Sequence, residues 1–180
     1  MLNRSEMKKF IRSLNEDEAF RVLNNLLDDI PDLVKTVYDI ALKVVDEVEP
    51  DEIMDEVFCT LNALDMDDLS GRSGRTRYGY IEPCDAAFEI FEEALQPFID
   101  EMKKNYKRAM PAVAKAYCIG IVKGLWKYEN EATSDFSGWV EDAPDICVDH
   151  VVAEWKKGNP NSEDIAEVAC VVENGRSYVD

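Results

Sequence analysis

The chain has 180 residues, of which 46% are hydrophobic and 32% charged, and its formal net charge is −18 at pH 7. A chain of this length buries roughly 70% of the surface that its unfolded form exposes, so it can build a core without disulfides or metals. This composition excludes a disordered chain, and the negative charge disfavours nucleic acid and anionic membranes as partners.

The first part of the chain predicts four amphipathic helices. Asn15 is followed by three acids, which is typical of a helix start because acids there meet the positive end of the helix dipole. Prolines mark the next two starts, since proline suits the first turn of a helix. The apolar residues recur at helical spacing over the predicted helices, which cover about 10–14, 16–27, 31–49 and 50–64.

Four more helices are predicted after residue 82. Pro97 lies inside the longest of them, so we expect a kink or a break there. In the next one Ala112, Ala116, Gly120 and Gly124 recur every fourth residue and leave a smooth strip, which favours close packing of another helix over a ligand groove. Residues 129–142 are expected to form a polar connection. The predicted helices cover about 83–106, 111–128, 144–157 and 163–175, the last capped by Ser162.

No segment shows the alternation of a strand bounded by hairpin turns. We therefore predict an all-α fold of about six to eight helices, either an antiparallel bundle or a short solenoid-like stack of helix pairs. The expected organisation is one domain over residues 1–180, with a basic loop rich in glycine and arginine at 70–82.

Charge is distributed unevenly along the chain. Residues 15–69 carry seventeen acids against three bases, whereas residues 102–128 carry seven bases and no acid. One interpretation is that the acidic and basic helices neutralise each other across the fold or face solvent. The other is that the basic segment, together with the loop, binds an anionic partner.

The basic loop is the strongest functional candidate. Residues 70–80 (SGRSGRTRYGY) hold three arginines and three glycines without an acid. Arginine offers a planar charged fork that suits phosphate and carboxylate, and glycine lets backbone amides approach an anion. The structural alternative is that the arginines pair with Asp65, Asp67, Asp68 and Glu82. The candidate partner-binding residues are Arg72, Arg75, Arg77, Tyr78 and Tyr80.

A second candidate site contains the chain's single histidine. Cys147, His150 and Glu154 are spaced so that thiol, imidazole and carboxylate could lie along one helix, as a thiol-dependent or metal-dependent enzyme would need. A buried cysteine and a structural histidine explain the same pattern more simply. No catalytic residue, metal site or cofactor is therefore predicted, and an enzyme is less expected than a binding protein.

Two stretches resemble a known kind of protein. Residues 13–37 (SLNEDEAFRVLNNLLDDIPDLVKTV) and 65–102 are similar to the little-characterised helical module that accompanies SWIM-type zinc-binding proteins in prokaryotes. The zinc-binding segment itself is absent, because Cys147 is followed by Val148 and Asp149 before His150. The resemblance implies a helical partner module of unknown biochemistry.

The cysteines indicate a reducing compartment. The chain has five, an odd number, widely spaced and without a Cys-x-x-Cys pair, so neither a disulfide framework nor a zinc ribbon is indicated. No signal peptide or membrane-length apolar run is found.

We expect a cytoplasmic, non-enzymatic adaptor that binds an acidic or phosphorylated protein partner through the loop. The alternatives are the Cys147 enzyme and an acidic mimic of nucleic acid; the oligomeric state is left open.

Overall fold

A computed structural model describes residues 3–45, 48–76 and 79–176. The chain divides into two compact units, Met1–Glu47 and Val48–Asp180, called here the N-terminal unit and the C-terminal unit. The expectation of one domain over 1–180 therefore stays a prediction.

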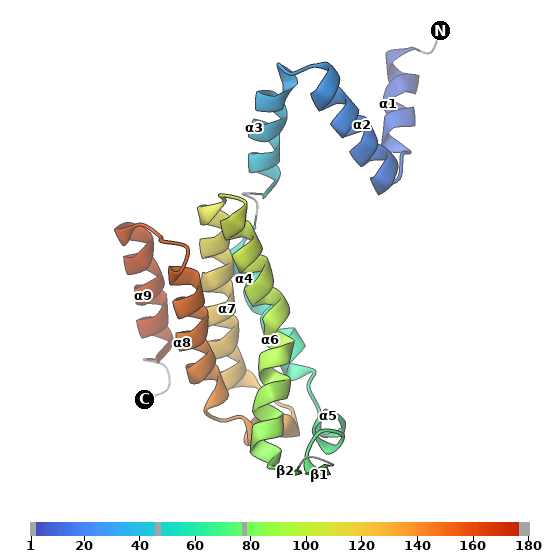
Figure 1. Ribbon diagram of the computed structural model, residues 1–180. Helices are drawn as coiled ribbons and strands as arrows, with labels where there is room; N and C mark the ends of the chain where they lie inside the picture. Colours follow the sequence, from blue (N-terminus) through green and yellow to red (C-terminus); the bar gives the residue numbers. More distant parts are fainter. Residues whose placement is uncertain (1–2, 46–47, 77–78, 177–180) are drawn as a thin grey trace. The chain divides into compact units, whose positions relative to one another are not determined.

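The structure confirms the all-α class (Figure 1). In the described residues it contains nine α-helices, one 3-10 helix and one hairpin of two three-residue strands. The short helix α5 is the one that the sequence did not predict. The elements are α1 (Arg4–Arg12), α2 (Glu16–Asp29), α3 (Leu33–Val45), α4 (Pro50–Asn62), α5 (Met66–Ser70), β1 (Gly74–Thr76), β2 (Gly79–Ile81), α6 (Pro83–Lys107), α7 (Pro111–Glu131), η1 (Asp135–Trp139), α8 (Ala143–Lys156) and α9 (Ser162–Arg176).

The N-terminal unit consists of α1, α2 and α3, joined by short turns. Both α1 and α2 begin with a capping box, in which the side chain of Asn3 or Asn15 accepts from the third helical residue and a glutamate reaches back to the cap. The predicted cap at Asn15 is thus confirmed. Helices α2 and α3 contact each other, yet neither α1 nor α2 buries a single described residue.

The C-terminal unit is a helical bundle centred on α7, which contacts α4, α6, α8 and α9 (Figure 1). Because one helix touches four others, the arrangement is a bundle and not a linear stack. The core includes aromatic side chains that are fully buried, and the rings of Phe91 and Tyr128 meet edge to face with centroids 5.2 Å apart. In the described part of the chain no helix combines the length and the apolar composition needed to cross a bilayer.

The glycine strip on α7 is where α4 packs, as the sequence predicts. A Cβ atom placed on Gly120 would lie 2.6 Å from Ile53 Cβ and 2.7 Å from the carbonyl oxygen of Pro50, and one on Gly124 would lie 2.7 Å from Val57 Cβ. No side chain larger than hydrogen fits there without movement of α4. Close packing of this kind compensates for the low helix propensity of glycine.

One local prediction is decided in part and another is corrected. Helix α6 runs through Pro97 without a break, and the expected kink stays a prediction. Pro97 is exposed, so the carbonyl that loses its bond can face water, while Leu95 and Ile99 on the buried side hold the helix to the core. The last helix is capped by Asn161 instead of Ser162, because the Asn161 side chain accepts from the backbone N–H of Asp164 at 2.8 Å.

A candidate partner-binding hairpin

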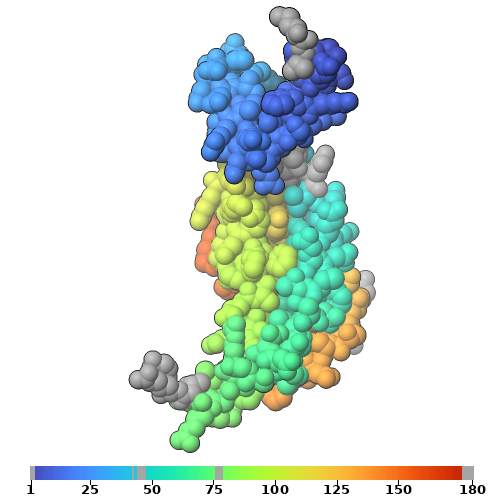
Figure 2. All heavy atoms as spheres, turned by 90° about the vertical axis from the view of Figure 1, so that its right-hand side faces the viewer, coloured from blue at the N-terminus to red at the C-terminus, as the bar shows by residue number. Residues whose placement is uncertain are grey.

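The segment predicted as a loop is a β-hairpin that projects from the end of the C-terminal unit (Figure 2). Helix α5 precedes it and is held by a capping box in which the Asp65 side chain accepts from the backbone N–H groups of Asp67 and Asp68. β1 and β2 then pair antiparallel. Gly74 and Gly79 have φ angles of 97° and 146°, a conformation that side chains with a Cβ rarely adopt.

The pairing register places Arg75 directly opposite Tyr80. Side chains of directly paired residues point to the same side of a hairpin and lie within contact distance of each other. Both residues are exposed, and Tyr80 keeps 64% of its surface accessible. The hairpin therefore presents a guanidinium group and an aromatic ring side by side to solvent. Arg77 and Tyr78 lie outside the residues whose side chains are described.

Arg72 is tethered, but by a different acid from those expected. Its guanidinium pairs with Glu93 of α6, and neither Asp65, Asp67, Asp68 nor Glu82 pairs with an arginine among the described residues. Asp65 and Asp68 instead close the capping box of α5. About half or more of each side chain in the Arg72 pair is exposed, so the pair stabilises the fold by at most about 1 kcal/mol. Arg75 makes no ion pair with another described residue.

Sequence reasoning missed Glu93, and no spacing signal could have found it. Glu93 lies 21 residues from Arg72, on a helix whose rotation relative to the hairpin is set by packing. Among acids near the loop, sequence distance favoured the aspartates of α5. The carboxylates of Asp65 and Asp68, however, already accept backbone N–H groups at the start of α5.

The basic segment 102–128 is largely neutralised within the molecule. Four of its lysines reach acids on other helices, which confirms the first of the two interpretations of the charge pattern. Lys104 also pairs, with Glu101 on its own helix. The pairs between helices are Lys103–Glu154 at 2.8 Å, Lys115 with Asp164 and Glu167 at 2.7 Å each, Lys123–Asp51 at 2.7 Å and Lys127–Asp55 at 2.8 Å.

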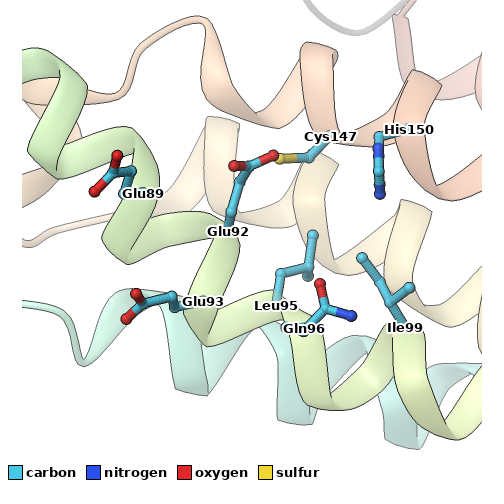
Figure 3. A pocket seen from close by; sticks show the side chains of 8 residues that line it. All are labelled: Glu89, Glu92, Glu93, Leu95, Gln96, Ile99, Cys147 and His150. Carbon is cyan, nitrogen blue, oxygen red and sulfur yellow. The ribbon is translucent and has the colours of Figure 1, made fainter.

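Cys147 and His150 line one cavity of about 280 Å³ between α6 and α8, together with Glu89, Glu92 and Glu93 (Figure 3). Burial raises the pKa of the Cys147 thiol to about 12, and the nearby charge of Glu92 adds to that shift. A nucleophilic cysteine needs the opposite shift, because the thiolate is the reactive form. Cys147 is therefore a protonated core residue at neutral pH.

Glu154 does not join Cys147 and His150. It pairs instead with Lys103, and its hydrogen bonds from Lys103 and then Lys157 lower its pKa to about 2. The three residues of the second candidate site thus belong to two places, the cavity and the ion pair. Within the ranges 3–45, 48–76 and 79–176, no group of three or more histidine, cysteine, aspartate or glutamate residues could hold a metal ion.

Comparison of the chain with protein-family models, with curated proteins and with solved structures gives no match in any of the three. The resemblance to the helical module of SWIM-type proteins is therefore untested and stays a prediction.

Proposed function

We propose that the protein is a non-enzymatic adaptor whose hairpin, residues 70–82, binds an acidic or phosphorylated protein partner. One observation carries the proposal: Arg75 is exposed beside Tyr80 and makes no ion pair with another described residue. By contrast, five of the seven basic residues in 102–128 pair with acids of the same chain. Arginine that is not neutralised is available to an external anion.

The hairpin has the chemistry that anion recognition needs. A guanidinium fork can donate two parallel hydrogen bonds to a phosphate or carboxylate, and the neighbouring ring offers a flat apolar surface for the chain that carries it. The net charge of −18 repels polyanions at long range. Binding should therefore depend on short-range contacts with the hairpin and should weaken as salt rises, because salt screens exposed charges.

The cellular setting belongs to the same proposal. All five cysteines are free thiols, which supports the predicted reducing, cytoplasmic location. A helical partner module, as the resemblance implies, is consistent with an adaptor role. We propose no cofactor.

The two alternatives receive less support. The enzyme needs Cys147, His150 and Glu154 in one place, and Glu154 is tied to Lys103 and Lys157 instead. The nucleic-acid mimic needs a row of free carboxylates, but Asp51 and Asp55 of α4 already pair with lysines of α7. Neither the enzyme nor the nucleic-acid mimic is therefore favoured over an adaptor that binds through the hairpin.

Binding of a phosphorylated peptide tests the proposal. The probe is a fluorescein-labelled peptide with three phosphoserines, titrated with the full chain and followed by fluorescence anisotropy. Arg75→Ala should weaken binding about tenfold or more, since hydrogen bonds to charged groups contribute about 1.5–3 kcal/mol. The unphosphorylated peptide should bind much more weakly at low salt.

Lys107→Ala is the matched control, because Lys107 is exposed, carries the same charge and makes no ion pair in the described part of the chain. It should leave the affinity unchanged. The proposal fails if Arg75→Ala and Lys107→Ala weaken binding equally. It also fails if Arg75→Ala lowers the melting temperature while the affinity for the phosphorylated peptide stays at the wild-type value.

A further inference from the structure

The N-terminal unit exposes an unusual amount of apolar surface. Phe10 of α1 and Phe20 of α2 are each 64% exposed, and Tyr38 of α3 is 58% exposed. Single exposed apolar residues are normal on protein surfaces, whereas a contiguous set marks a contact surface. The large apolar side chains exposed in this unit are Met7, Phe10, Ile11, Phe20, Val22, Leu23, Leu26, Ile30, Val34, Tyr38 and Ile40.

Most of these residues fall on one face of their helix. In α1 the spacing is i, i+3 and i+4, and in α2 the apolar residues repeat every three positions. The residues concerned are Met7, Phe10 and Ile11 in α1 and Phe20, Leu23 and Leu26 in α2. This spacing is typical of a helix that packs against another helix. An isolated helix of this length is marginal in water and owes its stability to packing of the apolar face. Helices α1 and α2 therefore require a partner surface that their own unit does not supply.

The charges of α1 and α2 are complementary. Helix α1 carries four bases and one acid, whereas α2 carries five acids and one base. The whole N-terminal unit holds ten acids and seven bases and is thus close to neutral, while the C-terminal unit holds 28 acids and 13 bases. Two copies of the chain repel each other through their C-terminal units and can approach through their N-terminal units.

We propose that the occupant of this surface is a second copy of the chain. In a dimer with two-fold symmetry, α1 of one copy lies on α2 of the other, and the same contact recurs after rotation. The apolar faces are buried together, and the basic helix meets the acidic helix twice. A stable interface of this kind buries roughly 1,200–2,000 Å². The seven large apolar side chains that α1 and α2 expose in each copy contribute to this area.

The first experiment measures the mass of the full chain in solution by light scattering after size exclusion, over a wide concentration range. The wild-type chain should have the mass of a dimer. Phe10→Glu combined with Phe20→Glu should produce a monomer, because charges would be buried in the interface. Ile146→Glu is the control: Ile146 is 51% exposed on α8 in the C-terminal unit, and its replacement should leave the dimer intact.

The second experiment tests the pairing of α1 with α2 by charge reversal. One variant carries Lys8→Glu and Lys9→Glu, and another carries Asp28→Lys and Asp29→Lys. Each alone should dimerise about tenfold more weakly or worse, because like charges then face each other. Mixed together, the two variants should form a heterodimer of near wild-type affinity, since each altered helix meets its complement.

Circular dichroism shows whether each variant keeps its helices, so that loss of association is not confused with unfolding. A wild-type chain that is monomeric at every concentration would overturn the proposal. So would a dimer that is broken by Ile146→Glu and unaffected by the paired phenylalanine substitutions, or charge-reversed variants that fail to associate when mixed.

Discussion

Replacing Gly120 with alanine should destabilise the C-terminal unit, although alanine is the better helix former. The new Cβ would lie 2.6 Å from Ile53 Cβ and 2.7 Å from the Pro50 carbonyl oxygen. Ordinary carbon contacts are 3.5–4.0 Å, so α4 must move away by about 1 Å. Neither contact atom can rotate away, and α4 contributes Ile53, Val57 and Leu61 to the core.

The magnitude follows from two opposing terms. Alanine gains about 1 kcal/mol of helix propensity over glycine, whereas forcing extra volume into a packed core costs about 1–3 kcal/mol. With two rigid contacts the upper part of that range applies, which leaves a net loss of about 2 kcal/mol. For a unit of this size the melting temperature should fall by roughly 8 °C.

Urea denaturation followed by circular dichroism measures this change, and Gly138→Ala serves as the control. A Cβ at Gly138 meets nothing within 4 Å, so that variant should stay within about 0.5 kcal/mol of the wild type. The reasoning about the α4–α7 contact is refuted if Gly120→Ala is as stable as the wild type or more stable.

Two further predictions concern titratable groups. Burial raises the thiol pKa of Cys118 and Cys147 to about 12, so a thiol reagent at pH 8 should label them only after unfolding; labelling of Cys147 in the native protein at the rate of the exposed cysteines would contradict this. The exposed thiols, which should react quickly, are Cys59, Cys84 and Cys170. Hydrogen bonds from Lys103 and Lys157 lower the pKa of Glu154 to about 2. The ionised carboxylate therefore stabilises the fold above its unfolded pKa, and this contribution is lost as pH falls from about 4.5 to about 2. Glu154→Gln should be less stable than the wild type at pH 7 and should lose less stability over that pH interval; the prediction is wrong if the free energy of unfolding falls equally in both chains.

The helices could be predicted from the sequence because their signals are local. Apolar periodicity, a polar cap and a proline in the first turn lie within a few residues of one another. Helices α4, α6 and α7 accordingly begin at Pro50, Pro83 and Pro111, as predicted. The glycine strip was also informative, since a repeat every four residues fixes one face of a helix and only close packing needs it bare.

Short elements and long-range pairs could not be predicted in the same way. Helix α5 has five residues and one buried side chain, Leu69, so it shows no period. Its capping box, Asp65 with Asp68, was the available signal. The strands of the hairpin have three residues each, too few for alternation to be seen. The partner of Arg72 depended on how the hairpin and α6 pack, which sequence spacing does not contain.

The role of the basic residues in 102–128 could not be predicted from the charge pattern of the sequence alone. From the sequence, the bases of 102–128 could bind an external anion or neutralise the chain's own acids. The ion pairs of Lys115, Lys123 and Lys127 with acids 49 to 72 residues away decide for neutralisation. That outcome weakens the case for the lysines of α7 and leaves the hairpin as the candidate binding surface.

If the proposed function is correct, anions bind the hairpin and not the lysines of 102–128. A nuclear magnetic resonance titration of the ¹⁵N-labelled full chain with the triply phosphorylated peptide distinguishes the two surfaces. The largest chemical-shift changes should fall within residues 70–82, including the amides of Gly74 and Gly79, and should fade as salt is added. Changes concentrated around the lysines of α6 and α7, with the hairpin resonances unmoved, would contradict it.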